Sequence, residues 1–342
     1  MYEWDIGETG NFVKTVSPET TLTLNGSIIK QVTCVSRTTI DNKVSLLDTV
    51  TLILSPGWTK SSEQKFLQQK IEEIVLKDSI LYLFTINSDE EDVSDNSSVQ
   101  LWQSTDASTW KNIGSPAIPR EHSRPIVHKN MFCTADVNGY LMTSTDGLVW
   151  EKSINPICST FVGSGSAYSP AGDTKYAPQL FSIDTRLFVR PNSRTVQGDS
   201  IFYSENLTHW NYAELSYSLN IADCVYSNNM TVFLGYSWDA IEWRLGILTG
   251  NNIENLSEPY RTTGDSYPYS HSFSEYHCFI RGDYILVFIN SHPLYIWDTK
   301  LNKWEIIPLP EEISGYHSYV FTSFKNNYYK VGTDGTFRMN ID

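Results

Sequence analysis

The chain has 342 residues, and its 25 Lys and Arg against 39 Asp and Glu give a formal net charge of −14. A surface this acidic repels phosphate backbones and anionic lipid headgroups, which argues against nucleic-acid binding and against docking on an anionic membrane. Hydrophobic residues make up 40% of the chain, and 10 Trp, 20 Tyr and 15 Phe are present, so the composition predicts a globular protein built mostly of β-strands.

The first elements of the chain predict a strand and a helix. Residues 2–6 lack the basic and apolar parts of a signal peptide, and no apolar run in the sequence approaches the roughly 20 residues that cross a bilayer. We therefore expect no membrane insertion. Residues 61–64 have capping-box spacing and precede apolar residues at i, i+4 intervals, which predicts a linker helix over residues 61–74.

Three short segments then repeat one pattern. Residues 104–110 and 144–150 share the letters S-T-D-x-x-x-W, and residues 204–210 are a weaker copy. Each copy lies between two short alternating strands, so we expect a hairpin turn. A short Asp or Asn side chain accepts hydrogen bonds from backbone N–H groups two residues on, and a glycine tolerates a positive φ at such a turn. The residues expected to hold these turns are Ser104, Asp106, Trp110, Ser144, Asp146, Gly147, Trp150, Ser204, Asn206 and Trp210.

These segments resemble the Asp-box, also known as the BNR repeat, of sialidase-like β-propellers. Residues 127–133 and 138–141 together with the box at residues 144–150 look like one whole blade of that family, with an inner strand, a hairpin, the box and an outer strand. The resemblance implies an all-β fold: a seven-bladed β-propeller with four-stranded antiparallel blades, formed as a single domain over residues 1–342. Six blades is the alternative count.

With that blade as a ruler, the others follow in chain order. The expected blades cover residues 21–58, 74–113, 125–154, 179–215, 221–261 and 276–309, and a last blade over residues 318–342 is one strand short. Residues 2–6 are expected to supply the missing strand, because Trp4 resembles the Trp that opens the outer strands at Trp150 and Trp304. The N- and C-terminal strands would then close the ring within one blade and remove its open edges.

Other segments match the box less well. Residues 55–58, 249–252 and 298–304 are interpreted as worn copies in blades that have lost the full pattern. Residues 237–243 fit S-x-D-x-x-x-W, but they fall between the second and third strands of a blade. We interpret that match as coincidence.

The candidate binding surface is the face opposite the boxes. The connections between blades and the loops from second to third strands gather there, and the long loops at residues 87–98, 114–124, 155–178, 258–275 and 310–317 belong to it. Aromatic platforms with convergent polar groups suit sugar rings or protein hot spots. The candidate binding residues are Arg120, His122, Arg124, Tyr168, Arg190, Arg194, Tyr267, Tyr269, His271, Tyr316 and His317. The same residue types are ordinary on solvated loops, and that alternative stays open.

No catalytic residue, metal ligand or cofactor is predicted. The family's early Arg-Ile-Pro motif is missing, so the arginines, Tyr nucleophile and acid of sialidases cannot be carried over. The histidines form no zinc signature, the acidic run at residues 89–95 lacks EF-hand spacing, and the five cysteines, without a CxxC pair, predict buried reduced thiols. An inverting glycosidase needs only two carboxylates, which leave no sequence signature.

Together these features predict a non-catalytic binding or assembly module. Acidic short-box propellers rich in Asn, Ser, Tyr and Trp resemble a class of bacteriophage tail and virion proteins. That resemblance implies a virion component, made in the host cytoplasm, that contacts other virion proteins and directs its loop face toward a host glycan or a neighbouring subunit. The alternatives are a glycoside hydrolase or sialidase-like enzyme acting on surface polysaccharide, and a cellular assembly factor that holds another protein.

Overall fold

Every regular element in the described part of the chain is a β-strand. The computed structural model describes residues 2–6, 12–15, 30–40, 43–54, 57–62, 66, 69–87, 99–119, 122–157, 177–190, 200–214, 220–227, 230–238, 243–250, 260–261, 276–289, 293–307, 309 and 319–339. Within these ranges no helix has the length and apolarity to cross a membrane.

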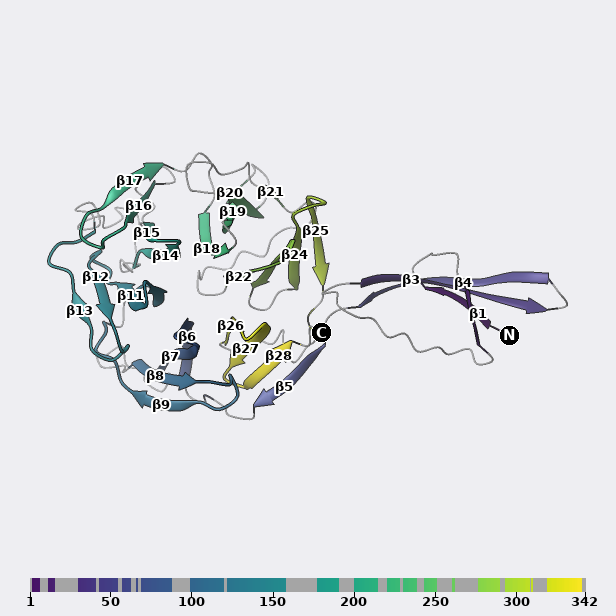
Figure 1. Cartoon of the computed structure of the whole chain (residues 1–342), viewed down its shortest axis with the longest axis horizontal. Coiled ribbons are helices and arrows are strands. Elements are labelled where there is room, and N and C mark those ends of the chain that lie inside the picture. Colours follow the sequence, from purple (N-terminus) through teal and green to yellow (C-terminus); the bar gives the residue numbers. More distant parts are fainter. Residues whose placement is uncertain are drawn as a thin grey trace, which may run out of the picture.

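Six four-stranded antiparallel sheets form a ring, and the fold is a six-bladed β-propeller (Figure 1). The first three blades are β6 (Gln69–Lys77), β7 (Ile80–Asn87), β8 (Val99–Ser104), β9 (Lys111–Gly114); β10 (Ile126–His128), β11 (Met131–Ala135), β12 (Leu141–Ser144), β13 (Glu151–Lys152); and β14 (Gln179–Ile183), β15 (Arg186–Arg190), β16 (Ser200–Ser204), β17 (Asn211–Glu214).

The fourth and fifth blades are β18 (Asn220–Ser227), β19 (Met230–Trp238), β20 (Trp243–Gly250), β21 (Tyr260–Arg261); and β22 (Tyr276–Arg281), β23 (Tyr284–Ile289), β24 (Leu294–Asp298), β25 (Lys303–Ile307). The sixth combines β26 (Tyr319–Phe324), β27 (Asn327–Gly332) and β28 (Gly335–Met339) with β5 (Trp58–Ser62). The predicted blades over residues 74–113, 125–154, 179–215, 221–261 and 276–309 are therefore confirmed.

One hydrophobic cluster fills each junction between neighbouring blades. Successive side chains of a strand point to opposite faces of its sheet, so each blade feeds two clusters. In β7, Leu81 and Leu83 pack against the sixth blade, whereas Phe84 and Ile86 pack with Phe132 of the second. Four more clusters of this kind complete the ring. The core is thus a circle of six interfaces, and no blade is buried without both neighbours.

The sequence prediction of seven blades gives way to its alternative of six. Within the segment expected to form a blade at residues 21–58, β3 (Lys30–Ile40) and β4 (Lys43–Leu54) pair instead in a separate sheet with β1 (Tyr2–Ile6) and β2 (Phe12–Thr15), in the order β2-β1-β3-β4. Figure 1 shows this N-terminal sheet, in purple, outside the ring. β3 and β4 form a hairpin of 11 residue pairs, which leaves the other edge of β3 free to pair. β1 pairs with that edge along Cys34–Thr38.

Ring closure by an N-terminal strand is confirmed, but the strand is β5 and not residues 2–6. β5 pairs with β28 from Trp58↔Met339 to Ser62↔Thr336. The Trp58 ring lies 6.2 Å from the rings of both Phe288 and Phe321, so it anchors the strand in the junction of the fifth and sixth blades. The five-residue pattern around Trp4 is too short to distinguish the two candidates.

The predicted helix over residues 61–74 is wrong where the structure describes it, because residues 61–62 belong to β5 and residues 69–74 to β6. β6 contains a bulge between Ile71 and Glu73. An extra residue in a strand puts Ile71 and Ile74, three apart, on the same side, and both pack with Phe66 in one cluster. The bulge therefore imitates helical spacing in the sequence.

Candidate functional site

The inner strands of the six blades place one residue each at a common level. Counting back four residues from the last residue of each inner strand, and extending the register of β10 by two residues, gives an equivalent position in all six blades. These residues are Glu73, Arg124, Gln179, Asp223, His277 and Val320. We name this set the central ring.

Arg124 joins three blades at the centre. Its Nε lies 3.3 Å from Oε2 of Glu73 in the first blade, and its Nη1 donates a hydrogen bond to the carbonyl oxygen of Tyr276, at 3.3 Å, in the fifth. The second and fifth blades face each other across a six-bladed ring, so the side chain spans its middle. Arg124 thereby supplies a donor to the inward edge of β22.

The two acids of the central ring sit at matching bulges. Register shifts occur at Ile71/Glu73 in β6 and at Ile221/Asp223 in β18. Glu73 accepts a bond from the backbone N–H of Ile74 at 2.9 Å, and Asp223 accepts one from Cys224 at 2.8 Å.

Asp223 also closes an open strand edge. The backbone N–H of Cys278 in β22 donates to Asp223 Oδ2 at 2.7 Å, and on the preceding junction Arg190 Nη1 donates to the carbonyl of Ile221 at 3.1 Å. The inner strand of a blade leaves N–H and C=O groups facing the centre, and buried backbone groups need partners. Side chains from other blades supply these partners.

Burial dominates the electrostatics of this centre. It raises the pKa of Glu73 from 4.5 to about 7, against the opposing effects of Arg124 and the Ile74 N–H. It raises the pKa of Asp223 as well, again against Arg124. Burial and the neighbouring guanidinium together hold the pKa of His277 well below its ordinary value. Near neutral pH the ring thus combines one arginine, a neutral histidine and a carboxyl group that is close to half protonated.

Three of the candidate binding residues fall within the described ranges, and they do not form one surface. Arg124 and Arg190 lie at the centre, while His122 has Nδ1 2.8 Å from the carbonyl of Pro119 and pairs with Asp136 in an isolated bridge. The other eight, Arg120, Tyr168, Arg194, Tyr267, Tyr269, His271, Tyr316 and His317, lie outside the described residues, and their joint surface stays a prediction.

Sequence reasoning missed Glu73, Asp223 and His277. A signal exists for the two acids: when the ends of β6 and β18 are aligned, the sequences Ile-Glu-Glu-Ile-Val and Ile-Ala-Asp-Cys-Val share an Ile, an acid and a Val at the same positions. An alignment of the blades on their boxes does not reveal this match. It superimposes the third and fourth strands, but the distance along the chain from the box back to the inner strand differs between blades.

The boxes lie in the turns between third and fourth strands, as predicted. Asp146 Oδ1 accepts the N–H groups of Leu148 and Val149 at 2.8 and 2.9 Å, and Asp106 does the same for Ser108 and Thr109. Asn206 and, in the worn copy at residues 298–304, Asp298 each accept two N–H groups in the same way. We call these four segments the box turns.

Hydrogen bonds and backbone shape hold each box turn together. Bonds from Val149 and Leu148 lower the pKa of Asp146; in Asp106 burial acts in the opposite direction, but bonds from Thr109 and Ser108 lower its pKa overall. Gly147 has φ +79°, and a Cβ there would lie 2.7 Å from Leu101 Cδ2. The box turns and the inner hairpin turns share one face of the ring, the box face, where Lys129 Nζ donates to the carbonyl of Glu205.

Three of the five cysteines are free thiols, as predicted: Cys133 and Cys278 are buried and Cys224 is half-buried. For Cys34 and Cys158 the reduced state stays a prediction. Burial raises the pKa of Cys133 to about 12, which keeps this thiol protonated.

No family model matches the sequence, and no curated protein matches it. Among solved structures, YCF48 from Cyanidioschyzon merolae is similar with a TM-score of 0.44 and 13% identity, covering 82% of this chain and 98% of that one. An α-L-arabinofuranosidase from Clostridium thermocellum gives 0.39 and 11%, over 78% and 83%, and Saccharomyces cerevisiae Sqt1 gives 0.40 and 10%, over 83% and 99%. The propeller assignment rests on the strand pairing of this chain itself.

Proposed function

We propose that this chain is a non-catalytic propeller that binds other proteins and serves as an assembly module. The observation that carries the proposal is that the side chains of the central ring bind backbone groups and one another. Its acids accept backbone N–H groups and face Arg124, and its arginine supplies the edge of the opposite blade. Most of the polar contacts made by the central ring therefore join blades, and Arg124 Nη2 and His277 Nε2 are the members left without a hydrogen-bond partner among the described residues.

The narrower form of the proposal is a bacteriophage tail or virion component. It is supported by the box turns and by the acidic, Asn- and Tyr-rich composition. In this form the partners are other virion proteins, and the loop face is directed toward a host glycan or a neighbouring subunit. Mass spectrometry of purified particles tests it: absence of the chain from particles contradicts the virion role and leaves the broader proposal standing.

A glycosidase is the second candidate, and one observation favours it. A carboxyl group with a pKa of about 7 is suited to act as a general acid, and Glu73 has that pKa. Glycoside hydrolysis also needs a second carboxylate that stays ionised. Burial raises the pKa of Asp223 too, so the two acids are shifted in the same direction rather than apart, which supports the non-catalytic proposal.

The test is a hydrolysis assay with the purified chain on a panel of polysaccharides and aryl glycosides, run beside a glycan-binding array. We expect no product release. Release of product that Glu73→Gln and Asp223→Asn both abolish, while Glu205→Gln on an exposed turn leaves it unchanged, would overturn the proposal. Glycan binding without hydrolysis would support an adhesion role for the loop face.

A further inference from the structure

A cavity of about 440 Å³ opens where three inner strands end at the box face. Leu76 near the end of β6 and the last two residues of β22, Ile280 and Arg281, form part of its wall. The hairpin of residues 323–328, between β26 and β27, forms the rest. We call it the mouth pocket. It belongs to the first, fifth and sixth blades, and it has the size of an ordinary ligand or side-chain pocket.

The mouth pocket is positively charged in an acidic protein. Its lining contains Arg281 and Lys325 and no carboxylate. Two acids on the neighbouring hairpin turns have cations of their own: Asp283 lies 2.6 Å from Lys300, and Asp78 lies 3.1 Å from Lys77. The chain as a whole carries −14, so this site is a local reversal of sign that favours an anionic group.

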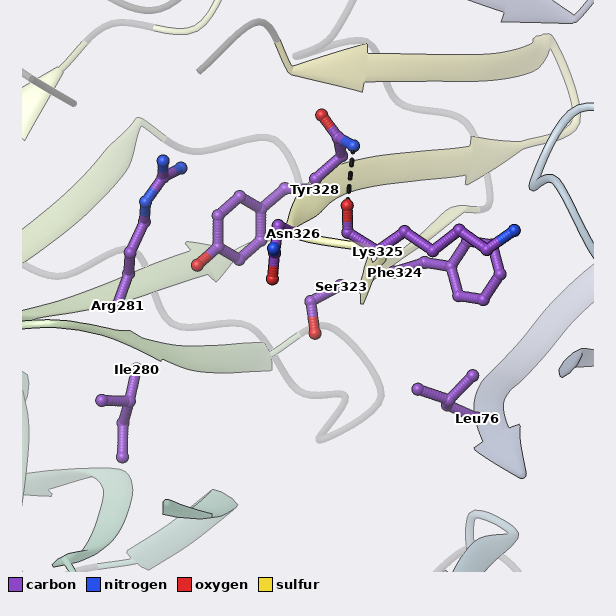
Figure 2. A pocket seen from close by; sticks show the side chains of 9 residues that line it. Leu76, Ile280, Arg281, Ser323, Phe324, Lys325, Asn326 and Tyr328 are labelled. Carbon is purple, nitrogen blue, oxygen red and sulfur yellow. Dashed lines mark hydrogen bonds between the residues drawn. The ribbon is translucent and has the colours of Figure 1, made fainter. Parts of the chain in front are cut away.

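Arg281 also carries a donor that lacks an acceptor. Its Nη1 is buried and has no hydrogen-bond partner among the described residues. A buried donor left unsatisfied costs about 1–3 kcal/mol, so an acceptor is expected there when the site is occupied. Figure 2 shows Arg281 on one side of the pocket, next to the Tyr328 ring, with Ser323 and Asn326 between it and Lys325, whose side chain runs away from Arg281 past the Phe324 ring. Lys325 Nζ donates one hydrogen bond to the carbonyl oxygen of Thr105 at 3.0 Å, and an ammonium group has three donors, so two remain for a ligand.

Apolar side chains form part of the pocket wall. Leu76 is 45% exposed, and Ile280 and Phe324 line the pocket with it. An exposed apolar side chain beside a polar pocket favours a protein contact over a small free anion, because a free anion makes no use of it.

We propose that the mouth pocket receives an acidic side chain of a partner protein, with the carboxylate between Arg281 and Lys325 and the partner's flanking apolar residues against Leu76. This rests on the proposed assembly function and names the chemistry of the partner segment. The carboxylate supplies the acceptor that Arg281 Nη1 lacks, and the amide and hydroxyl groups of Asn326 and Ser323 offer it further donors.

The test uses an array of fluorescent heptapeptides whose central residue is Glu, Asp, Gln or Lys and whose flanking residues are Leu, Phe, Val or Ser. Binding to the full chain is measured by fluorescence anisotropy. We expect the best Glu peptide with apolar flanks to bind at least about tenfold more tightly than its Gln counterpart, which corresponds to about 1.4 kcal/mol. Its affinity should fall as salt is raised.

Matched variants locate the binding. Lys325→Gln and Arg281→Gln are each expected to weaken the Glu peptide about tenfold. Asn326→Asp, which keeps a residue that tolerates the observed φ of 62°, should abolish binding by placing a carboxylate in the pocket. Lys129→Gln is the control: Lys129 begins the equivalent hairpin turn of the second blade and, like Lys325, donates to a box-turn carbonyl, but it lies outside the pocket.

Equal binding of Glu and Gln peptides, an equal loss in Lys129→Gln, or no peptide bound at about 1 mM would each overturn this inference. Circular dichroism of each variant separates loss of binding from loss of fold. Hydrolysis in the glycoside assay would remove the proposed non-catalytic function while leaving peptide binding to be judged by the anisotropy data. If neither hydrolysis nor peptide binding is detected, the proposed role of the mouth pocket is contradicted and the non-catalytic function stands.

Discussion

At the scale of single residues, the burial of Glu73 in the central ring raises its pKa. Glu73 is 7% exposed and accepts a backbone N–H, yet burial keeps its pKa near 7. A buried ion pair with Arg124 recovers only part of the cost of taking the carboxylate out of water. The protonation state of this one group is therefore tied to the stability of the junctions that meet at the centre.

Glu73 predicts a pH dependence with a definite sign. The pKa is raised from 4.5 to about 7, so between these values the folded chain binds a proton that the unfolded chain releases. The free energy of unfolding contributed by Glu73 is highest below about pH 4.5 and falls by about 3 kcal/mol as the pH rises to about 7. Urea unfolding of Glu73→Gln across this range should show a flatter profile than the wild type.

The matched control is Glu205→Gln, which removes a carboxylate that is 61% exposed in its pair with Arg186. It should leave the slope of the wild type unchanged. An unaltered slope in Glu73→Gln would mean that the carboxyl group is not buried in the way the structure shows.

At the scale of elements, the box turn works as a short polar staple. In the second blade Asp146 accepts bonds from Leu148, Val149 and the Ser144 hydroxyl, and Trp150 Nε1 donates to the carbonyl of Gly147. The turn thereby fixes where the outer strand begins. Asn206 makes the equivalent backbone contacts in the third blade, so charge is not needed for the geometry.

Asp146→Ala is expected to lower the free energy of unfolding by about 1–2 kcal/mol, because two N–H groups lose their acceptor. Asp146→Asn should cost less than half of that, since Asn206 already shows that an amide oxygen accepts both bonds. Thermal unfolding of the three proteins measures the difference. Equal losses for Ala and Asn would assign the stability to the negative charge rather than to the hydrogen bonds.

The sequence predicts the elements whose pattern is local and fails where a pattern depends on the fold. The box turns and five of the blades follow from residues within about 40 positions of one another. The bulge at Glu73 looks helical in sequence, and the choice of β5 over β1 as the closing strand depends on which edge is open in three dimensions. The central ring was missed because its members, from Glu73 to Val320, come together only when the ring is closed.

At the scale of the whole molecule, closure depends on β5. It supplies the outer strand of the sixth blade, and Trp58 packs against Phe288 and Phe321. Without it, the edge of β28 and the aromatic junction beside it would be left open to water and to other chains. The N-terminal sheet forms no part of this closure.

Two truncations separate these roles. A chain that starts at residue 55 keeps β5 and is expected to retain a single cooperative unfolding transition by circular dichroism. A chain that starts at residue 66 loses β5 and should unfold at markedly lower urea concentration and aggregate through the open edge. Similar stability in both chains would show that β5 is dispensable for the ring.

The antiparallel register of the closing pair has a mechanical consequence. Trp58 and Met339 lie opposite each other, so the chain enters and leaves the ring at the same end of one two-strand ribbon. A force applied between the N-terminal sheet and the segment after β28 therefore peels the ribbon open one hydrogen bond at a time, instead of loading all of its bonds in shear. Six hydrophobic interfaces hold the ring together, but tension between these two ends acts on the β5–β28 pair alone.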